Sequence, residues 1–247
     1  MKTFITNFKT EFKLTLRGVD TIFFGVLFPV VTVIVIGLIM GNGSAQNGVD
    51  YNNIDQSFGA IVTIGICATG LMGFPLTIAD YRHRKILKRY QVTPVSPGII
   101  LFVQCLVNFI VSLISLLAVW LVCKVLFKYS MDGSVIYFMG AFVLVTFAVY
   151  GIGMMLASVA PNIKTANLLC TLLYFPMIFF SGATIPYEVM PKTAQNVMDF
   201  LPLTQGIKLL KSIALEIPNN HVPFQVGLML ACGVVCVIIS IFTFKWE

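Results

Sequence analysis

Six apolar runs of about twenty residues each constrain this chain more than any other feature of its sequence. No run contains Asp, Glu, Lys, Arg or His in its core. A helix rises about 1.5 Å per residue, so about twenty such residues cross the roughly 30 Å hydrocarbon core of a bilayer. The runs cover residues 21–40, 58–79, 99–123, 135–159, 167–185 and 224–244. They predict an all-α polytopic membrane protein with six transmembrane helices, folded as a single domain over residues 1–247.

The composition supports this class of protein. Of the 247 residues, 58% are hydrophobic and 11% are charged, whereas an ordinary soluble domain is about a quarter charged. The first run could alternatively be a secretory signal peptide. Its apolar core of about twenty residues is longer than the roughly 7–15 residues of a signal core, and a patterned segment precedes it. We therefore expect the first run to remain in the protein as a span.

Lys and Arg are distributed unevenly among the segments that join the runs. With the N-terminus inside, the inner segments hold eleven of these residues and the outer segments hold five. Short loops rich in Lys and Arg tend to stay cytoplasmic. We therefore predict that both termini are cytoplasmic, in the cell (plasma) membrane of a bacterium.

The first twenty residues carry an amphipathic pattern. Phe4, Phe8, Phe12 and Leu16 recur every four residues, and the lysines lie mostly off that stripe. Such a helix rests its apolar face in the membrane interface and its basic face among lipid head groups. A packed soluble helix would show the same pattern, but here a span follows directly. We predict an interfacial connecting helix over residues 1–20 that contacts membrane lipid.

The fifth run is interrupted by Pro176, Gly182 and Pro186, and a long mixed segment follows it. Proline and glycine are the strongest breakers of regular structure. We predict a broken or re-entrant fifth span, followed by short helices within an extracellular loop over residues 186–223. Irregular backbone at membrane depth must be buried in protein or line a cavity. The segment could therefore serve a translocation path, or its small residues could serve packing alone.

The densest charge in the chain lies in the segment over residues 80–98, between the second and third runs. Six of the eight residues over 82–89 are basic. A basic stretch beside a span usually sets topology and binds anionic lipid, and nucleic-acid binding is a weaker alternative. Ile86, Leu87 and Tyr90 add a short apolar stripe, and the prolines that follow end the helix. We predict a short cytoplasmic helix and a rigid turn, which together could transmit force from a soluble partner.

The sequence carries no motif for catalysis or nucleotide binding. It has no HExxH motif, no nucleophile elbow and no glycine followed by lysine, so it lacks a P-loop. Its six cysteines lie in or beside apolar runs, as packing residues do. We expect no catalytic residue, metal or cofactor on this chain. The uncharged spans disfavour an ion-coupled transporter, so any transport of cargo requires an outside motor unless the protein is a channel or a scaffold.

Two segments resemble ABC-2-type exporter permeases. The stretch "KILKRYQVTPVSPGIILFVQ" over 85–104 is similar to the cytoplasmic coupling helix of that family and its Thr-Pro turn. The stretch "FFSGATIPYEVMPKTAQNVMDFLPLTQGIKLLKSI" over 179–213 is similar to the family's order of Ser-Gly, two prolines and Leu-Pro-Leu-Thr. The length, the six runs and the N-terminal helix also agree. Many relatives have a glycine near Lys85 and acidic residues upstream, where this chain has bases.

The resemblance implies a homodimer with two copies of a separate ABC ATPase subunit below it, and ATP and Mg²⁺ held by that partner. The first and fifth spans would line the dimer interface. The residues implied to dock on the ATPase are Lys85, Ile86, Leu87, Lys88, Arg89, Tyr90, Thr93 and Pro94. Those implied to lie near the exit of the translocation path are Phe179, Phe180, Ser181 and Gly182.

These observations lead to one expected function and one alternative. We expect the membrane subunit of an ATP-driven exporter that moves an amphipathic drug, peptide, lipid-linked or glycan cargo outward. The alternative is an ATP-independent channel or scaffold that binds anionic lipid through residues 82–89. A membrane enzyme and a nucleic-acid-binding protein are both disfavoured.

Overall fold

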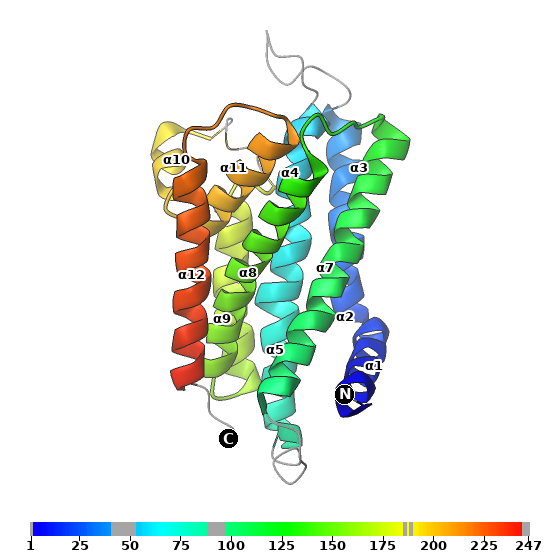
Figure 1. Ribbon diagram of the computed structural model, residues 1–247, viewed down its shortest axis with the longest axis vertical. Coiled ribbons are helices and arrows are strands. Elements are labelled where there is room, and N and C mark those ends of the chain that lie inside the picture. Colours follow the sequence, from blue (N-terminus) through cyan, green and yellow to red (C-terminus); the bar gives the residue numbers. More distant parts are fainter. Residues whose placement is uncertain (1, 41–52, 88–96, 185–186, 188–189, 244–247) are drawn as a thin grey trace.

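The computed structural model describes residues 2–40, 53–87, 97–184, 187 and 190–243 (Figure 1). Every regular element in these ranges is a helix, which confirms the all-α class. Five helices are long and apolar enough to cross a membrane: Ile54–His83, Ile99–Phe127, Val135–Val159, Ile163–Phe180 and Val222–Thr243. The first apolar run contains a shorter apolar helix, Phe23–Ile39. The chain has the helices of a multi-pass membrane protein, and the sixth crossing stays a prediction.

The helices follow one another in three groups. The first group is α1 (Lys2–Arg17), α2 (Val19–Ile22), the π-helical turn η1 (Phe23–Leu27) and α3 (Phe28–Met40). The second is α4 (Asn53–Cys67), the π-helical turn η2 (Ala68–Gly73) and α5 (Phe74–His83). The third is α7 (Pro97–Phe127), α8 (Val135–Val159), α9 (Ile163–Phe180), α10 (Lys192–Met198), α11 (Pro202–Ala214) and α12 (Val222–Thr243). In Figure 1, α1 lies at one end of the bundle, and α10 and α11 lie at the other.

Each π-helical turn directly precedes a Phe-Pro pair. Pro29 follows η1 and Pro75 follows η2. Proline has no N–H, and its ring would collide with the carbonyl group four residues earlier. The wider π-helical turn accommodates the proline without ending the helix. The two apolar helices therefore continue through their prolines, with η1 near the start of the first helix and η2 near the middle of the second.

The fifth apolar run forms one continuous helix as far as Phe180. Pro176 lies inside α9 and does not interrupt it. The chain turns after the helix at Gly182, whose φ of 89° favours glycine. Pro186 lies outside the described residues. The predicted re-entrant geometry stays a prediction, and two short helices, α10 and α11, follow in the chain.

Close packing at the centre of the bundle depends on glycines that meet the backbone of a neighbouring helix. A Cβ atom on Gly151 of α8 would come within 2.9 Å of the carbonyl oxygen of Gly233 on α12. Gly153 of α8 faces the carbonyl group of Gly70 in η2. Small residues let membrane helices approach closely enough for dispersion contacts between backbones. The helix α8 is thereby held between α12 and the α4–η2–α5 rod, as Figure 1 shows.

Candidate functional site

The helix α1 packs beside α7 through its aromatic stripe. Phe4 and Phe102 have ring centroids 6.2 Å apart, and Phe8 stacks on Phe12 at 5.9 Å. The three α1 phenylalanines are half-buried and Leu16 is exposed. The phenylalanines of the stripe therefore contact the protein with part of their surface, and the rest of the stripe faces outward. Contact of the stripe with lipid stays a prediction.

Glu11 is a buried acid on the inner side of α1, and the sequence reasoning missed it. The Tyr81 hydroxyl of α5 and the Gln104 amide of α7 both donate to Glu11 Oε2, each at 2.5 Å. A carboxylate acts as an acceptor for several donors at once. One side chain thus joins α1 to both α5 and α7. The available signal was a single acid in a helix that is otherwise basic.

Glu11 should make the stability of the protein depend on pH. Burial raises the pKa of Glu11 above its ordinary value of 4.5, although the hydrogen bonds from Tyr81 and Gln104 act in the opposite direction. The folded state then holds the proton more tightly than the unfolded state, so stability falls as pH rises from about 4.5 through the folded pKa. Glu11→Gln keeps both hydrogen bonds and removes this titration. Thermal unfolding across pH should show the fall in the wild type and not in Glu11→Gln. Parallel curves would contradict the assignment.

Charged groups near Glu11 could also contribute to the pH dependence of thermal unfolding. Asp80 and Arg84 line the same cleft and form an ion pair at 2.8 Å. Because this pair is largely exposed, solvent screens it and it contributes little. Tyr81→Phe is the matched control, because it removes one donor to Glu11 and keeps the carboxyl group. The fall of stability with pH should persist in Tyr81→Phe.

Arg82 joins the end of α5 to the turn between α8 and α9. This side chain is buried, and its guanidinium donates to the carbonyl oxygen of Ala160, in the turn between α8 and α9, at 2.5 Å. Arg84 is paired with Asp80 one turn earlier. The bases of the stretch over residues 82–89 therefore differ in role, because Arg82 positions the helix end within the protein.

The described part of the docking segment is Lys85, Ile86 and Leu87. Lys85 is exposed and has a φ of 57°, in the left-handed region that favours glycine. Many members of the family that the sequence resembles have a glycine near this position, and the left-handed conformation of Lys85 gives a physical reason for that glycine. Ile86 is half-buried and Leu87 is 1% exposed. Leu87 therefore anchors the segment within the chain.

The other predicted docking residues are Lys88, Arg89, Tyr90, Thr93 and Pro94, and all lie outside the described residues. Their role in binding an ATPase stays a prediction. The described residues on either side place the two ends of the segment at the end of α5 and the start of α7.

A cleft of about 1120 Å³ opens beside α1 and α5. Its walls come from α1, α2, η1, η2, α5 and the first residues of α9. Charged lining residues are Glu11, Asp80, Arg84 and Lys164, and apolar lining residues include Phe24 and Met72. The charged residues come from α1, from α5 and its end, and from α9, and the apolar ones come from the π-helical turns and from α1 and α5 as well. The cleft therefore combines charged and apolar side chains in its lining.

The predicted exit residues lie at the other end of α9. Phe179 and Phe180 are exposed, whereas Ser181 and Gly182 are buried. Ser181 donates to the carbonyl oxygen of Ile178 at 3.4 Å. At about 1.5 Å per residue, Lys164 and Phe180 are about 24 Å apart along the helix. The structure does not bring these four residues into the cleft, and their role in a path stays a prediction.

The fold defines a helical, multi-pass membrane protein. The comparisons with known proteins agree. The chain matches the family model described as "ABC-2 type transporter" over residues 2–215. The chain therefore belongs to the ABC-2 type transporter family, whose members are membrane transport subunits that work with a separate ATPase.

Curated relatives match parts of the chain. Nodulation protein J of Rhizobium meliloti (strain 1021) is 30% identical over 102 residues, which cover 41% of this chain and 39% of the relative. Inner membrane transport permease YhhJ of Escherichia coli (strain K12) is 27% identical over 166 residues, 65% of this chain and 44% of the relative. Nodulation protein J of Rhizobium leguminosarum bv. viciae is 32% identical over 89 residues, which cover 36% of this chain and 34% of the relative. Each match spans less than half the length of the relative.

Proposed function

We propose that this chain is the permease subunit of an ATP-driven exporter and moves an amphipathic cargo outward. The observation that carries the proposal is the cleft, because a lining that combines charged and apolar side chains fits a molecule with both a polar and an apolar part. Cargo of this kind includes drugs, peptides, lipid-linked molecules and glycan conjugates. The spans hold no Asp, Glu, Lys, Arg or His in their cores, which disfavours coupling to an ion gradient. The proposed source of energy is therefore a partner that hydrolyses ATP.

The same residues connect the cleft to the docking segment. Glu11 and Tyr81 line the cleft, and Ile86 lines it as well. Ile86 belongs to the segment that we propose docks on the ATPase. A displacement of this segment on ATP binding would therefore alter the wall of the cleft directly. The hydrogen bonds of Glu11 would carry the same displacement to α1 and α7.

A second copy of the chain is part of this proposal. Leu168, Leu172, Phe175 and Phe179 form an exposed stripe along α9, and the rings of Phe175 and Phe179 stack at 6.3 Å. Residues at this spacing lie on one helix face. The stripe supports the expectation that the first and fifth spans line a dimer interface. Two ATPase subunits, which hold ATP and Mg²⁺, complete the proposed assembly.

Filling the cleft tests the cargo site. Thr77 lines the cleft, is half-buried and donates to the carbonyl group four residues earlier. Thr77→Phe should weaken binding of an amphipathic probe by about tenfold, because it occupies the space that the probe needs. The probes are rhodamine 6G and a dansyl-labelled phospholipid, and the measurement is fluorescence anisotropy with the purified protein.

Thr32 provides the matched control. It too is half-buried and makes the same type of hydrogen bond, to Phe28, but it is absent from the cleft lining. Thr32→Phe should bind both probes as the wild type does. Equal affinities for Thr77→Phe and the wild type would rule out the cleft as the cargo site.

A further inference from the structure

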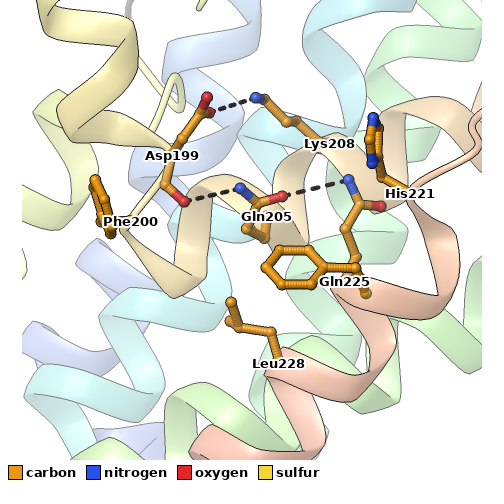
Figure 2. A pocket seen from close by; sticks show the side chains of 8 residues that line it. Asp199, Phe200, Gln205, Lys208, His221, Gln225 and Leu228 are labelled. Atoms are coloured by element: carbon orange, nitrogen blue, oxygen red, sulfur yellow. Dashed lines mark hydrogen bonds and ion pairs between the residues drawn. The ribbon is translucent and has the colours of Figure 1, made fainter.

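A second pocket, of about 420 Å³, lies at the end of the bundle away from α1. It is formed by the turn after α10, by α11 and by the start of α12, as Figure 2 shows. Its polar lining residues are Asp199, Gln205, Lys208, His221 and Gln225. Its apolar lining residues are Phe200, Phe224 and Leu228. The transport function proposed above makes no use of this pocket.

The charged groups of the pocket are held in fixed positions. Lys208 Nζ bonds Asp199 Oδ1 at 2.5 Å, and the Tyr187 hydroxyl donates to Asp199 Oδ2 at 3.1 Å. Lys208 Nζ also lies 3.9 Å from the centre of the Tyr187 ring. Both oxygens of the Asp199 carboxylate therefore already accept a hydrogen bond. The ammonium group of Lys208 is oriented by two neighbours.

The buried amides extend this network. Gln205 and Gln225 are 7% and 3% exposed. Gln205 Nε2 donates to the main-chain carbonyl of Asp199 at 2.9 Å, and Gln225 Nε2 donates to Gln205 Oε1 at 3.4 Å (Figure 2). Asn219 Nδ2 donates to Gln225 Oε1 at 3.0 Å. The side-chain oxygens of both glutamines thus already receive hydrogen bonds.

Unused donor protons remain available to a ligand in this pocket. An ammonium group has three protons and an amide nitrogen has two. The bonds above use one proton of Lys208 and one of each glutamine amide. His221 adds an exposed imidazole at the rim. Converging donors that include an ammonium group favour an anionic acceptor, and phosphate oxygens are strong acceptors of this kind.

The apolar wall of the pocket faces the surroundings of the bundle. Phe224 is 60% exposed and Phe200 is 87% exposed, and Leu228 follows Phe224 by one helical turn along α12. Exposed apolar side chains of a spanning helix lie among lipid acyl chains. The donors are on α11 and the first turn of α12, and the apolar track runs from them toward the middle of the bundle. This order of polarity is that of a phospholipid.

We propose that this pocket binds a membrane phospholipid in the leaflet opposite α1. The phosphate accepts hydrogen bonds from Lys208 and Gln225, and one acyl chain lies along Phe224 and Leu228. Because Lys208 is on α11 and Gln225 is on α12, the bound lipid joins the two helices. The ligand class is a phosphate ester carried on an apolar chain.

Lipid binding to the purified, delipidated protein tests the proposal. Native mass spectrometry would count the lipids bound as dioleoylphosphatidylglycerol is added. Dioleoylglycerol has the same chains without the phosphate, and inorganic phosphate is the soluble source of the same anion. The phospholipid should bind at least tenfold more tightly than dioleoylglycerol, and inorganic phosphate should not displace it.

Variants assign the binding to this pocket. Lys208→Gln should weaken phospholipid binding by about tenfold, the effect of one charge-assisted hydrogen bond. Lys208→Arg, which keeps charge and donors, should bind as the wild type does. Phe224→Ser should also weaken binding. Because Phe224 is exposed, this substitution should leave the protein folded. Lys192→Gln is the matched control, because Lys192 is an exposed lysine on α10 that does not line the pocket.

Each contrary result overturns a stated part of the proposal. Equal binding of dioleoylglycerol would exclude recognition of the phosphate. Displacement by inorganic phosphate would make the ligand a soluble phosphate and exclude a lipid. Wild-type affinity in both Lys208→Gln and Phe224→Ser would place the lipid elsewhere on the protein.

Discussion

Gly153→Ala should lower the stability of the bundle strongly, whereas Gly140→Ala, on the same helix, should not. A Cβ atom on Gly153 would collide with the carbonyl oxygen of Gly70 in η2. The obstacle is backbone, so α8 and η2 must separate to admit a methyl group. Overpacking of this kind costs about 1–3 kcal/mol and occasionally more, a large part of a typical stability of about 5–15 kcal/mol.

Gly140 makes this comparison a controlled one. A Cβ atom there would meet no atom within 4 Å, and alanine favours a helix over glycine by up to about 1 kcal/mol. Gly140→Ala should therefore unfold at the wild-type temperature or slightly above it. The measurement is thermal unfolding in detergent, together with the monodisperse fraction on size exclusion. Equal unfolding temperatures for the two variants would show that the contact between α8 and η2 is not close.

The double variant Leu87→Asp with Tyr90→Ala should lose the ATPase partner. Leu87 is 1% exposed, and a carboxylate at that position would be buried without a partner, which is strongly unfavourable. The segment would leave its place beside α5, and the proposed docking face would be lost with it. The ATPase should no longer co-purify with the variant, and ATP-driven transport should fall to the level without ATPase.

Lys85→Gly is the control within the same segment. Glycine adopts the left-handed conformation of Lys85 without strain, so the segment should keep its shape and the ATPase should co-purify as before. Intact assembly and transport in the double variant would make the docking proposal wrong.

The fold class was predictable because its signal is long and repeated. Apolar runs of membrane length admit few structures other than helices, and the described residues contain five of the six expected spanning helices and a shorter apolar helix in the first run. The π-helical turns were not predicted, although their cause is local. Pro29 and Pro75 were visible in the sequence, but a proline inside an apolar run is compatible with a kink, a break or a wider turn, and tertiary packing decides among them.

The site was less predictable because it depends on contacts between distant residues. Glu11, Tyr81 and Gln104 come from three helices, and no spacing in the sequence relates them. Gly140 and Gly153 likewise have the same local signal, and only the fold determines which one meets backbone. The family resemblance implied that Leu87 contacts the ATPase. The structure buries it within the chain, and its contact with an ATPase stays a prediction.

Transport by the reconstituted protein distinguishes an ATP-driven permease from a channel. The chain is placed in liposomes with and without the proposed ABC ATPase partner, and movement of rhodamine 6G or a dansyl-labelled phospholipid is followed on addition of ATP. We expect transport only when both ATP and the ATPase are present. We also expect Thr77→Phe, which fills the cleft, to abolish it. Transport by the chain alone, at the same rate without ATP, would contradict the account and would identify an ATP-independent channel.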